Sequence, residues 1–197
     1  HCGDDVYSQV AAWVFGGSRS DHPKGTPTRY QGMVTALAII FGASGKRVGA
    51  MTGNSDRRGY EILDTFWAQS PRSKRFVDEV RRRFRERGYV VTSFGRHERG
   101  RPDEDYKSVN KLIQGWAADL IKTMMVRIDE AGIVTDEHRG LRGQVHDDLR
   151  LDNLTREEVA EVAHVMTDFD LKVFLGVSVT SSDENWADVK EYKLADS

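Results

Sequence analysis

Residues that begin and end helices constrain the fold of this chain more than any other feature of its sequence. A Thr-Pro pair at 26–27 is the arrangement expected of an N-cap and a first helical residue, and the apolar run after it ends at Gly42. A Ser-Pro pair at 70–71 opens a second such segment, which ends at Gly88. A further helix is predicted within 4–17, where the apolar residues from Val6 to Val14 have helical spacing and Gly16 and Gly17 end the run. The other predicted helices cover about 106–131 and 155–168, the last with a Thr155/Glu158 capping box.

Three further segments have the β-branched and aromatic character of strands: 89–95, 141–151 and 171–180. We expect them to form one small antiparallel sheet, with a turn at His146–Asp148 inside the second segment. The predicted fold class is therefore α+β and mainly helical. Because no repeat or interdomain linker is evident, we expect a single piece of structure, helical over about 1–88 and containing the strands within about 89–197.

Composition excludes several classes of protein. The net charge of −2 argues against a uniformly basic nucleic-acid binder, so any basic surface must be local. No apolar run approaches about 18 residues, so we expect no membrane partner. A single cysteine, Cys2, excludes an intrachain disulfide framework and fits a reducing cytoplasm. The chain begins with His1 and lacks a signal-peptide pattern, and we expect it to be a piece of a longer polypeptide.

The sequence "QVHDDL" places two consecutive acids in the turn of the predicted hairpin, between Val145 and Leu149. Adjacent carboxylates repel each other, and crowding them costs free energy unless a positive charge neutralises them. A divalent cation would do so, because hard cations prefer carboxylate oxygens. A solvated turn is the alternative, since Asp is common in turns.

Four blocks occur in an order that resembles the C-terminal part of family A DNA polymerases, the DNA polymerase I family, and most closely its bacteriophage branch. They are "RYQGMVTALAIIFGASG", like motif B; "GYVVTSFGR", like the strand and Gly-Arg after it; "NKLIQGWAADLIK", like a Gln-Gly-x-Ala-Ala-Asp helix; and "QVHDDL", like motif C. The ending "DENWADV" resembles phage members. The resemblance implies the C-terminal part of a right-hand polymerase fold, with mainly helical fingers over about 1–88 and a distal palm over about 89–197.

Motif C implies the catalytic and metal-binding residues. By resemblance, Asp147 is the metal-binding aspartate and Asp148 occupies the family's Glu position, where a shorter acid reaches less far. Both belong to a site for two Mg²⁺ ions, which activate the primer hydroxyl and neutralise the leaving pyrophosphate. Gln144 and His146 are implied contacts of the primer end and DNA, although a purely structural role for His146 stays open.

Motif B implies the nucleotide-binding residues, which recur every fourth position: Arg29, Met33, Leu37 and Phe41. Met33 stands where the family has a lysine, and a thioether cannot hold a triphosphate or protonate pyrophosphate. An ordinary exposed arginine at a helix start is the alternative for Arg29. Because its apolar residues lie nearly all the way round, we expect this helix to be largely covered by protein or ligand.

Further resemblance implies that Arg96, Asn110 and Gln114 contact DNA. The segment 71–87 carries eight basic side chains and three acids, so it either tracks template phosphates or is an ordinary solvated helix face.

The function implied is that of a DNA-directed DNA polymerase fragment from phage DNA replication, with primer–template DNA and deoxynucleoside triphosphates as partners. Motif A, which supplies the other metal-binding aspartate, precedes the part of the family that this chain resembles. Asp4 and Asp5 match a later aspartate, so we do not assign them a metal. We therefore expect the isolated chain to be inactive without the missing N-terminal part. The alternatives are a degenerate polymerase that only binds primer–template DNA, which Met33 favours, and, more remotely, a metal-dependent hydrolase.

Overall fold

The chain contains two compact units, His1–Gly115 and Trp116–Ser197, each with core clusters of its own. The computed structural model describes residues 5–134, 140–172, 175–182 and 188–192. Cys2, Asp4 and most of the "DENWADV" segment lie outside the described residues. The division reflects compactness alone, so the assignment of fingers to about 1–88 and palm to about 89–197 stays a prediction.

Unit 1 begins with helices whose ends agree with the sequence signals. α1 spans Val6–Phe15, α2 Pro27–Ile40 and α5 Pro71–Arg87. A short 3₁₀ helix between α1 and α2, η1 (Arg19–Asp21), was not predicted. Thr26 caps α2 by accepting a hydrogen bond from the Arg29 amide at 3.3 Å. Gly88 ends α5 with a left-handed φ of 76°, a conformation that suits glycine.

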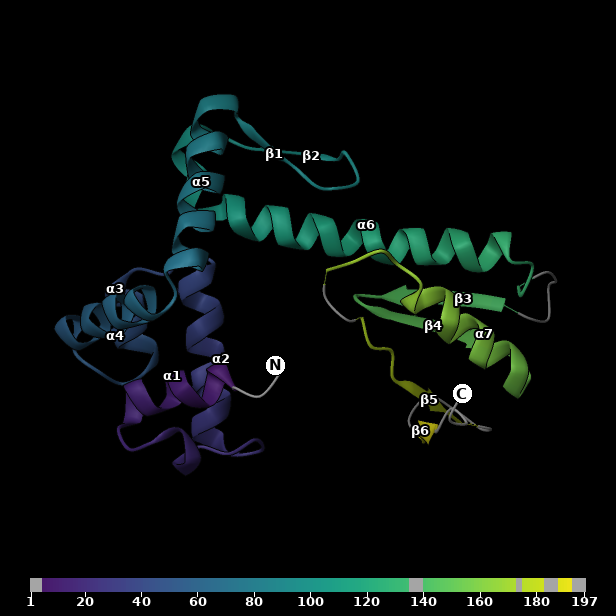
Figure 1. The fold of residues 1–197 in the computed structure, drawn as a ribbon, viewed down its shortest axis with the longest axis horizontal. Coiled ribbons are helices and arrows are strands. Elements are labelled where there is room, and N and C mark those ends of the chain that lie inside the picture. The colour runs from purple at the N-terminus through teal and green to yellow at the C-terminus, as the bar shows by residue number, and fades with distance from the viewer. Residues whose placement is uncertain (1–4, 135–139, 173–174, 183–187, 193–197) are drawn as a thin grey trace. The chain divides into compact units, whose positions relative to one another are not determined.

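Two α-helices of unit 1 were also not predicted. α3 spans Gly45–Met51 and α4 spans Asp56–Gln69, and the two pack together (Figure 1). Ser44 and Ser55 cap them, each accepting a hydrogen bond at 3.3 Å from an amide three residues on. The apolar pattern of these two segments is too short to predict helices from the sequence. Both helices are stabilised mainly by packing against their neighbours.

The core of unit 1 joins α1, α2, α3 and α4. Its buried residues are Val10, Val14, Ala36, Ile39, Val48, Ile62 and Phe66. Gly32 of α2 lies directly against α1, since a Cβ there would be 2.3 Å from the Tyr7 carbonyl oxygen. Among the residues of α2 only Pro27, Tyr30 and Leu37 are exposed, and the others are buried or half-buried. The expectation that protein or ligand covers most of this helix stays a prediction for the exposed positions.

The remainder of unit 1 packs on α5. β1 (Tyr89–Val91) pairs antiparallel with β2 (His97–Arg99), and η2 (Pro102–Lys107) leads into α6 (Ser108–Glu130). Val77, Val80 and Phe84 of α5 are buried with Val90 and Val109. Phe76, which the sequence places on the same stripe, is 50% exposed, because it lies at the margin of that stripe on the helix.

Unit 2 packs the later part of α6 against a hairpin and a helix (Figure 1). β3 (Gly140–Val145) pairs with β4 (Asp148–Asp152), and α7 spans Arg156–Thr167. The predicted capping box of α7 is present, with reciprocal bonds between Thr155 and Glu158. A third hairpin pairs β5 (Val179–Ser181) with β6 (Lys190–Tyr192).

The α+β class is confirmed, but the single sheet predicted from 89–95, 141–151 and 171–180 is wrong. The described strands form three separate two-stranded sheets. Alternation of side chains identifies an extended segment but not its partner, and in each hairpin the partner is the nearest strand in sequence. The partners β2 and β6 are short polar segments that carry little strand signal. Among the described residues, no helix is both long enough and apolar enough to span a membrane.

Candidate active site

The β3–β4 hairpin places the two candidate acids at its tip. Val145 pairs with Asp148, so His146 and Asp147 form a two-residue turn, close to the predicted turn at His146–Asp148. His146 has a positive φ of 56°, as the first position of such turns requires. The side-chain amide of Gln144 donates to the carbonyl oxygen of His146 and closes the turn. Asp147 and Asp148 are both exposed.

Two leucines anchor this hairpin. Leu149 packs against Leu120, Ile121 and Met124 of α6 and also against the cluster of Ile128, Ile133 and Val162. Leu151 joins the second of these clusters. Val145 is 45% exposed and does not serve as an anchor. The apolar residues that follow the acids therefore fix the hairpin, while its tip projects into solvent.

The hairpin tip offers part of a site for Mg²⁺. Asp147 and Asp148 supply hard oxygen donors of the kind that Mg²⁺ prefers, which fits the predicted ion. Within the described ranges no group of three or more His, Cys, Asp or Glu side chains gathers as metal ligands. The two acids match the chemistry of a metal-binding turn, and further ligands are needed to complete a two-metal site.

α2 displays the four predicted nucleotide residues along one side. Arg29, Met33 and Leu37 recur one turn apart, and Phe41 follows the last helical residue as the C-cap. The opposite face, with Gly32, Thr35, Ala36 and Ile39, is buried. Leu37 is 36% exposed, while Met33 and Phe41 are half-buried. This side of α2 is therefore partly accessible, most of all at Leu37, and its one cation among the four residues is Arg29, whose side chain is 18% exposed.

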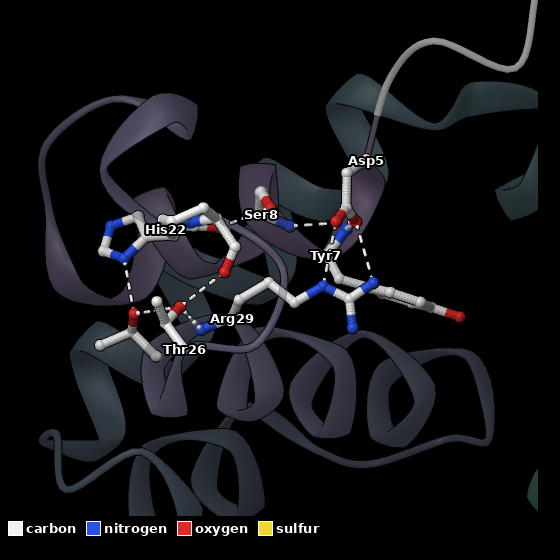
Figure 2. Close-up of polar contacts among 8 residues, drawn as sticks. Asp5, Tyr7, Ser8, His22, Thr26 and Arg29 are labelled. Carbon is white, nitrogen blue, oxygen red and sulfur yellow. Dashed lines mark hydrogen bonds and ion pairs between the residues drawn. The ribbon is translucent and has the colours of Figure 1, made fainter.

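Arg29 is held by Asp5, the N-cap of α1, and by Tyr7 of α1, as Figure 2 shows. Its Nε donates to Oδ2 of Asp5 at 2.9 Å, and its Nη2 donates to Oδ1 at 3.4 Å. The guanidinium carbon lies 4.8 Å from the centre of the Tyr7 ring, a cation–π contact. The Arg29 guanidinium lowers the pKa of the Asp5 carboxyl, and the amides of Tyr7 and Ser8 lower it further.

Asp5 was not predicted as a site residue. An Asp before the apolar run at Val6 does signal an N-cap, and Asp5 accepts from the Tyr7 amide at 3.0 Å. Its ion pair with Arg29, 24 residues later, depends on how α1 packs against α2, for which no local pattern exists. The loop between them is fixed by His22, whose ring contacts the Thr28 hydroxyl and the Gly16 carbonyl, each at 2.9 Å.

The predicted DNA contacts of unit 1 gather where the β1–β2 hairpin meets α6. Arg96 follows the tight turn at Gly95 and lies 3.5 Å from Glu98. Glu98 in turn packs on α6 at Gly115, where a Cβ would lie 3.0 Å from its Oε1. The sequence Gln114-Gly115 therefore brings a glycine against the hairpin and leaves Gln114 exposed, with Asn110 exposed one turn earlier. Gln144 and His146 belong to unit 2.

The basic helix α5 is partly neutralised by its own acids. Arg82 contacts both Glu79 and Glu86, at 2.8 and 2.6 Å, and Arg83 contacts Glu79 at 2.6 Å. These two arginines lower the pKa of Glu79 to about 2. Across residues 5–134 and the other described ranges, four arginines of α5 have no ion pair: Arg72, Arg75 and Arg87, which are exposed, and Arg81, which is partly buried. A polyanion would therefore meet three exposed arginines on this helix that no acid compensates.

Comparisons with known proteins identify relatives that match most of this chain. The family model described as "DNA polymerase family A" matches residues 1–188. DNA polymerase I of Streptococcus pneumoniae (strain ATCC BAA-255 / R6) is 29% identical over 171 residues, covering 81% of this chain and 19% of the relative. The thermostable DNA polymerase I of Thermus thermophilus is 30% identical over 208 residues, covering 96% of this chain and 24% of the relative.

A phage protein and a solved structure are also similar to this chain. The DNA-directed DNA polymerase of Pseudomonas phage M6 is 35% identical over 114 residues, covering 55% of this chain and 16% of the relative. The POL domain of Pol1 from M. smegmatis, solved in complex with DNA primer-template and dNTP, superposes with a TM-score of 0.68 at 22% identity. That match covers 84% of this chain and 30% of the solved one, and it establishes similarity of fold. The chain spans about a fifth of the length of the relatives named here.

Proposed function

Because this chain belongs to DNA polymerase family A, we propose that it forms the fingers and distal palm of a DNA-directed DNA polymerase. The reaction is the template-directed addition of deoxynucleotides to a primer 3′-hydroxyl. The observation that carries this proposal is the exposed Asp147 in a tight turn whose following leucine, Leu149, is anchored in two core clusters. Such a turn holds an acid at a fixed position while leaving it open to ions and substrate.

Asp147 and Asp148 are the proposed catalytic and metal-binding residues. Mg²⁺ bound there would lower the pKa of the primer hydroxyl and neutralise charge on the pyrophosphate. The role of the chain is to hold carboxylate oxygens at the hairpin tip, which the Gln144 contact to His146 and the Leu149 anchor both support. An aspartate of motif A, in a segment that precedes the one described, is proposed to complete the two-metal site.

The incoming deoxynucleoside triphosphate is proposed to bind on the partly accessible side of α2. Arg29 would contact the triphosphate, Met33 and Leu37 would line the sugar and phosphate path, and Phe41 would stack near the nascent base pair. The exposure of Leu37 and the partial exposure of Met33 and Phe41 support this assignment, since a ligand can reach them. Met33 gives no positive charge to a triphosphate, so Arg29 would be the main cation on this helix.

Primer–template DNA is the second proposed partner. Arg96, Asn110 and Gln114 are proposed to contact the duplex at the junction of the β1–β2 hairpin with α6, and Gln144 and His146 to contact the primer end. The packing of Glu98 on Gly115 supports the first set, because it brings the hairpin to the helix that carries the amides. The uncompensated arginines of α5 are proposed to lie along template phosphates.

A role in phage DNA replication, in the cytoplasm of the host cell, is part of the same proposal. The phage M6 relative, 35% identical over 114 residues, supports it.

Primer extension tests the proposed function. The polypeptide that carries this chain together with the motif A segment is incubated with Mg²⁺, a primed template and four deoxynucleotides, beside Asp147→Ala and Asp170→Ala variants. Asp170 is an exposed acid of the same unit and serves as the matched control. We expect extension by the parent and the control and none by Asp147→Ala. Extension by Asp147→Ala at the parental rate would contradict the assignment, and the 197-residue chain alone is expected to be inactive.

The alternative proposal is a protein that binds primer–template DNA without chemistry, and Met33 is the observation that favours it. A Met33→Lys variant separates the two. If only the lysine variant extends primers while both proteins bind DNA equally, the natural protein is a DNA binder. If the Met33 protein extends primers by itself, the triphosphate is held without that lysine and the polymerase proposal stands.

A further inference from the structure

Asp5 joins the start of α1 to the first turn of α2 (Figure 2). Its carboxylate accepts hydrogen bonds from the backbone amides of Tyr7 and Ser8, at 3.0 and 3.4 Å. Both amides donate to Oδ1, which also accepts from Nη2 of Arg29 at 3.4 Å, while Oδ2 accepts from Nε of Arg29 at 2.9 Å. One carboxylate thus satisfies the open amides of a helix end and also fixes an arginine of the neighbouring helix.

The orientation of the Arg29 guanidinium is set in two directions. The contacts with Asp5 fix the group within its own plane, because a planar guanidinium meets a carboxylate along one edge. The Tyr7 ring fixes one face of that plane, at 4.8 Å from the guanidinium carbon. The Arg29 side chain is 18% exposed, and these contacts restrict its rotamers in the absence of a ligand.

The edge of the guanidinium formed by Nη1 and the second hydrogen of Nη2 faces away from Asp5. In the portion of the chain that the structure describes, Nη1 of Arg29 has no hydrogen-bond partner, whereas Nε and one hydrogen of Nη2 are taken by Asp5. Two N–H groups on the outer edge suit a phosphate, whose oxygens accept from such a pair. An arginine paired on one edge can therefore bind an anion on the other.

We propose that Asp5 is a positioning residue for the incoming deoxynucleotide, holding Arg29 with its outer edge toward the triphosphate. The inference rests on the proposed function, in which Arg29 contacts that triphosphate. It goes further in one respect. Arg29 is the only cation among the four nucleotide residues of α2, and its orientation is assigned to Asp5, the N-cap of α1. With Met33 uncharged, binding depends on the orientation of Arg29 more than it would with a second cation beside it.

The sign of the effect distinguishes positioning from simple electrostatics. Removing the negative charge of Asp5 would, by Coulomb attraction alone, tighten the binding of an anion. Removing a positioning group has the opposite effect, because the ligand must then order a side chain with many rotamers. At 0.3 M salt, where the Debye length is about 6 Å, the Coulomb contribution is largely screened and the ordering cost dominates.

The test compares four forms of the polypeptide that carries this chain together with the motif A segment: the parent, Asp5→Asn, Arg29→Ala and Asp78→Asn. Asn is as good an N-cap as Asp, so Asp5→Asn removes the charge and keeps the start of α1. Asp78 is the matched control, since it also pairs with a cation, Lys74, at 2.7 Å on the surface of another helix. Mg²⁺–dATP binding is measured by calorimetry at 0.3 M salt. We expect about three- to tenfold weaker binding for Asp5→Asn and unchanged binding for Asp78→Asn.

A second readout follows Arg29 itself. The Nε–H signal of Arg29 in ¹⁵N NMR, assigned by its loss in Arg29→Ala, is expected to be sharp in the parent and in Asp78→Asn, and broadened or shifted in Asp5→Asn. Equal or tighter dATP binding by Asp5→Asn, or an unchanged Arg29 signal in that variant, would overturn the positioning role. Absence of dATP binding in the parent, with the Arg29 signal behaving as expected, would instead contradict the proposed nucleotide site.

Discussion

A Gly32→Ala substitution tests the packing that brings Arg29 to Asp5. The backbone of α1 lies so close to Gly32 that a Cβ would be 2.3 Å from the Tyr7 carbonyl oxygen, 2.8 Å from the Ala11 amide nitrogen and 2.9 Å from the Ala11 Cβ. Two of these atoms belong to the backbone of a helix and cannot rotate away. The two helices must therefore move apart.

The expected change in stability follows from two opposing effects. Alanine is better than glycine in a helix by about 1 kcal/mol, which favours the variant. Overpacking costs about 1–3 kcal/mol or more, and the rigid backbone contacts place this site at the upper end of that range. We therefore expect Gly32→Ala to lower the free energy of unfolding by about 2 kcal/mol and to weaken the contact between Arg29 and Asp5.

Urea unfolding followed by circular dichroism measures this change, with Gly143→Ala as the matched control. Gly143 has open space around its Cβ position and an ordinary φ, so its replacement should leave stability the same or slightly higher. A Gly32→Ala protein at least as stable as the parent would refute the close approach of α1 and α2 and, with it, the geometry that holds Arg29.

Three further predictions concern the hairpin, the ion pair and the basic helix. Leu149→Ala should lower the free energy of unfolding by about 2 kcal/mol, the low end of the range for leucine because the side chain is half-buried. Denaturant unfolding measures this loss, with Val145→Ala as the exposed control. Equal losses for the two variants would contradict the anchoring role of Leu149. The folded-state pKa of Asp5 lies below its ordinary value of 3.8, so the Asp5–Arg29 pair stabilises the chain above about pH 4 and loses this contribution as the pH falls through the folded pKa. The free energies of unfolding of the parent and of Asp5→Asn, measured against pH, should therefore converge at low pH. A constant difference between the two proteins at all pH values would disprove the linkage. Arg72→Gln with Arg75→Gln should weaken binding to a primed template and reduce its salt slope by about 1 for each phosphate that an arginine no longer neutralises, whereas Arg82→Gln, whose guanidinium already contacts Glu79 and Glu86, should change both less.

Helix ends were the part of the fold most open to prediction from sequence. The caps at Thr26 and Thr155 and the stop at Gly88 act through hydrogen bonds and backbone angles within a few residues, so the local sequence contains the necessary information. The turn of the β3–β4 hairpin was predictable for the same reason. Strand pairing was not, because β2 and β6 are short and polar and their pairing depends on neighbours that alternation does not specify.

The residues of the candidate site likewise fall into those that local sequence predicts and those that depend on tertiary packing. The spacing of Arg29, Met33 and Leu37 is enough to predict that they share one side of a helix, and that side is partly accessible. Asp5 carries only the local signal of an N-cap, and its second role arises where α1 packs closely against α2 at Gly32. Which arginines of α5 form ion pairs was likewise not predictable. Arg82 and Arg83 reach Glu79, whereas Arg72 and Arg75 reach no acid among the described residues.

The most direct test of the central proposal is primer extension by the polypeptide that carries this chain and its motif A segment, measured for the parent, Asp147→Ala and Asp170→Ala. Two-metal phosphoryl transfer at the hairpin tip predicts extension by the parent and Asp170→Ala and a loss of at least about a thousandfold in Asp147→Ala, since a metal ligand stabilises the transition state by several kcal/mol. Equal extension rates in all three proteins would contradict the proposal that Asp147 holds the catalytic metal.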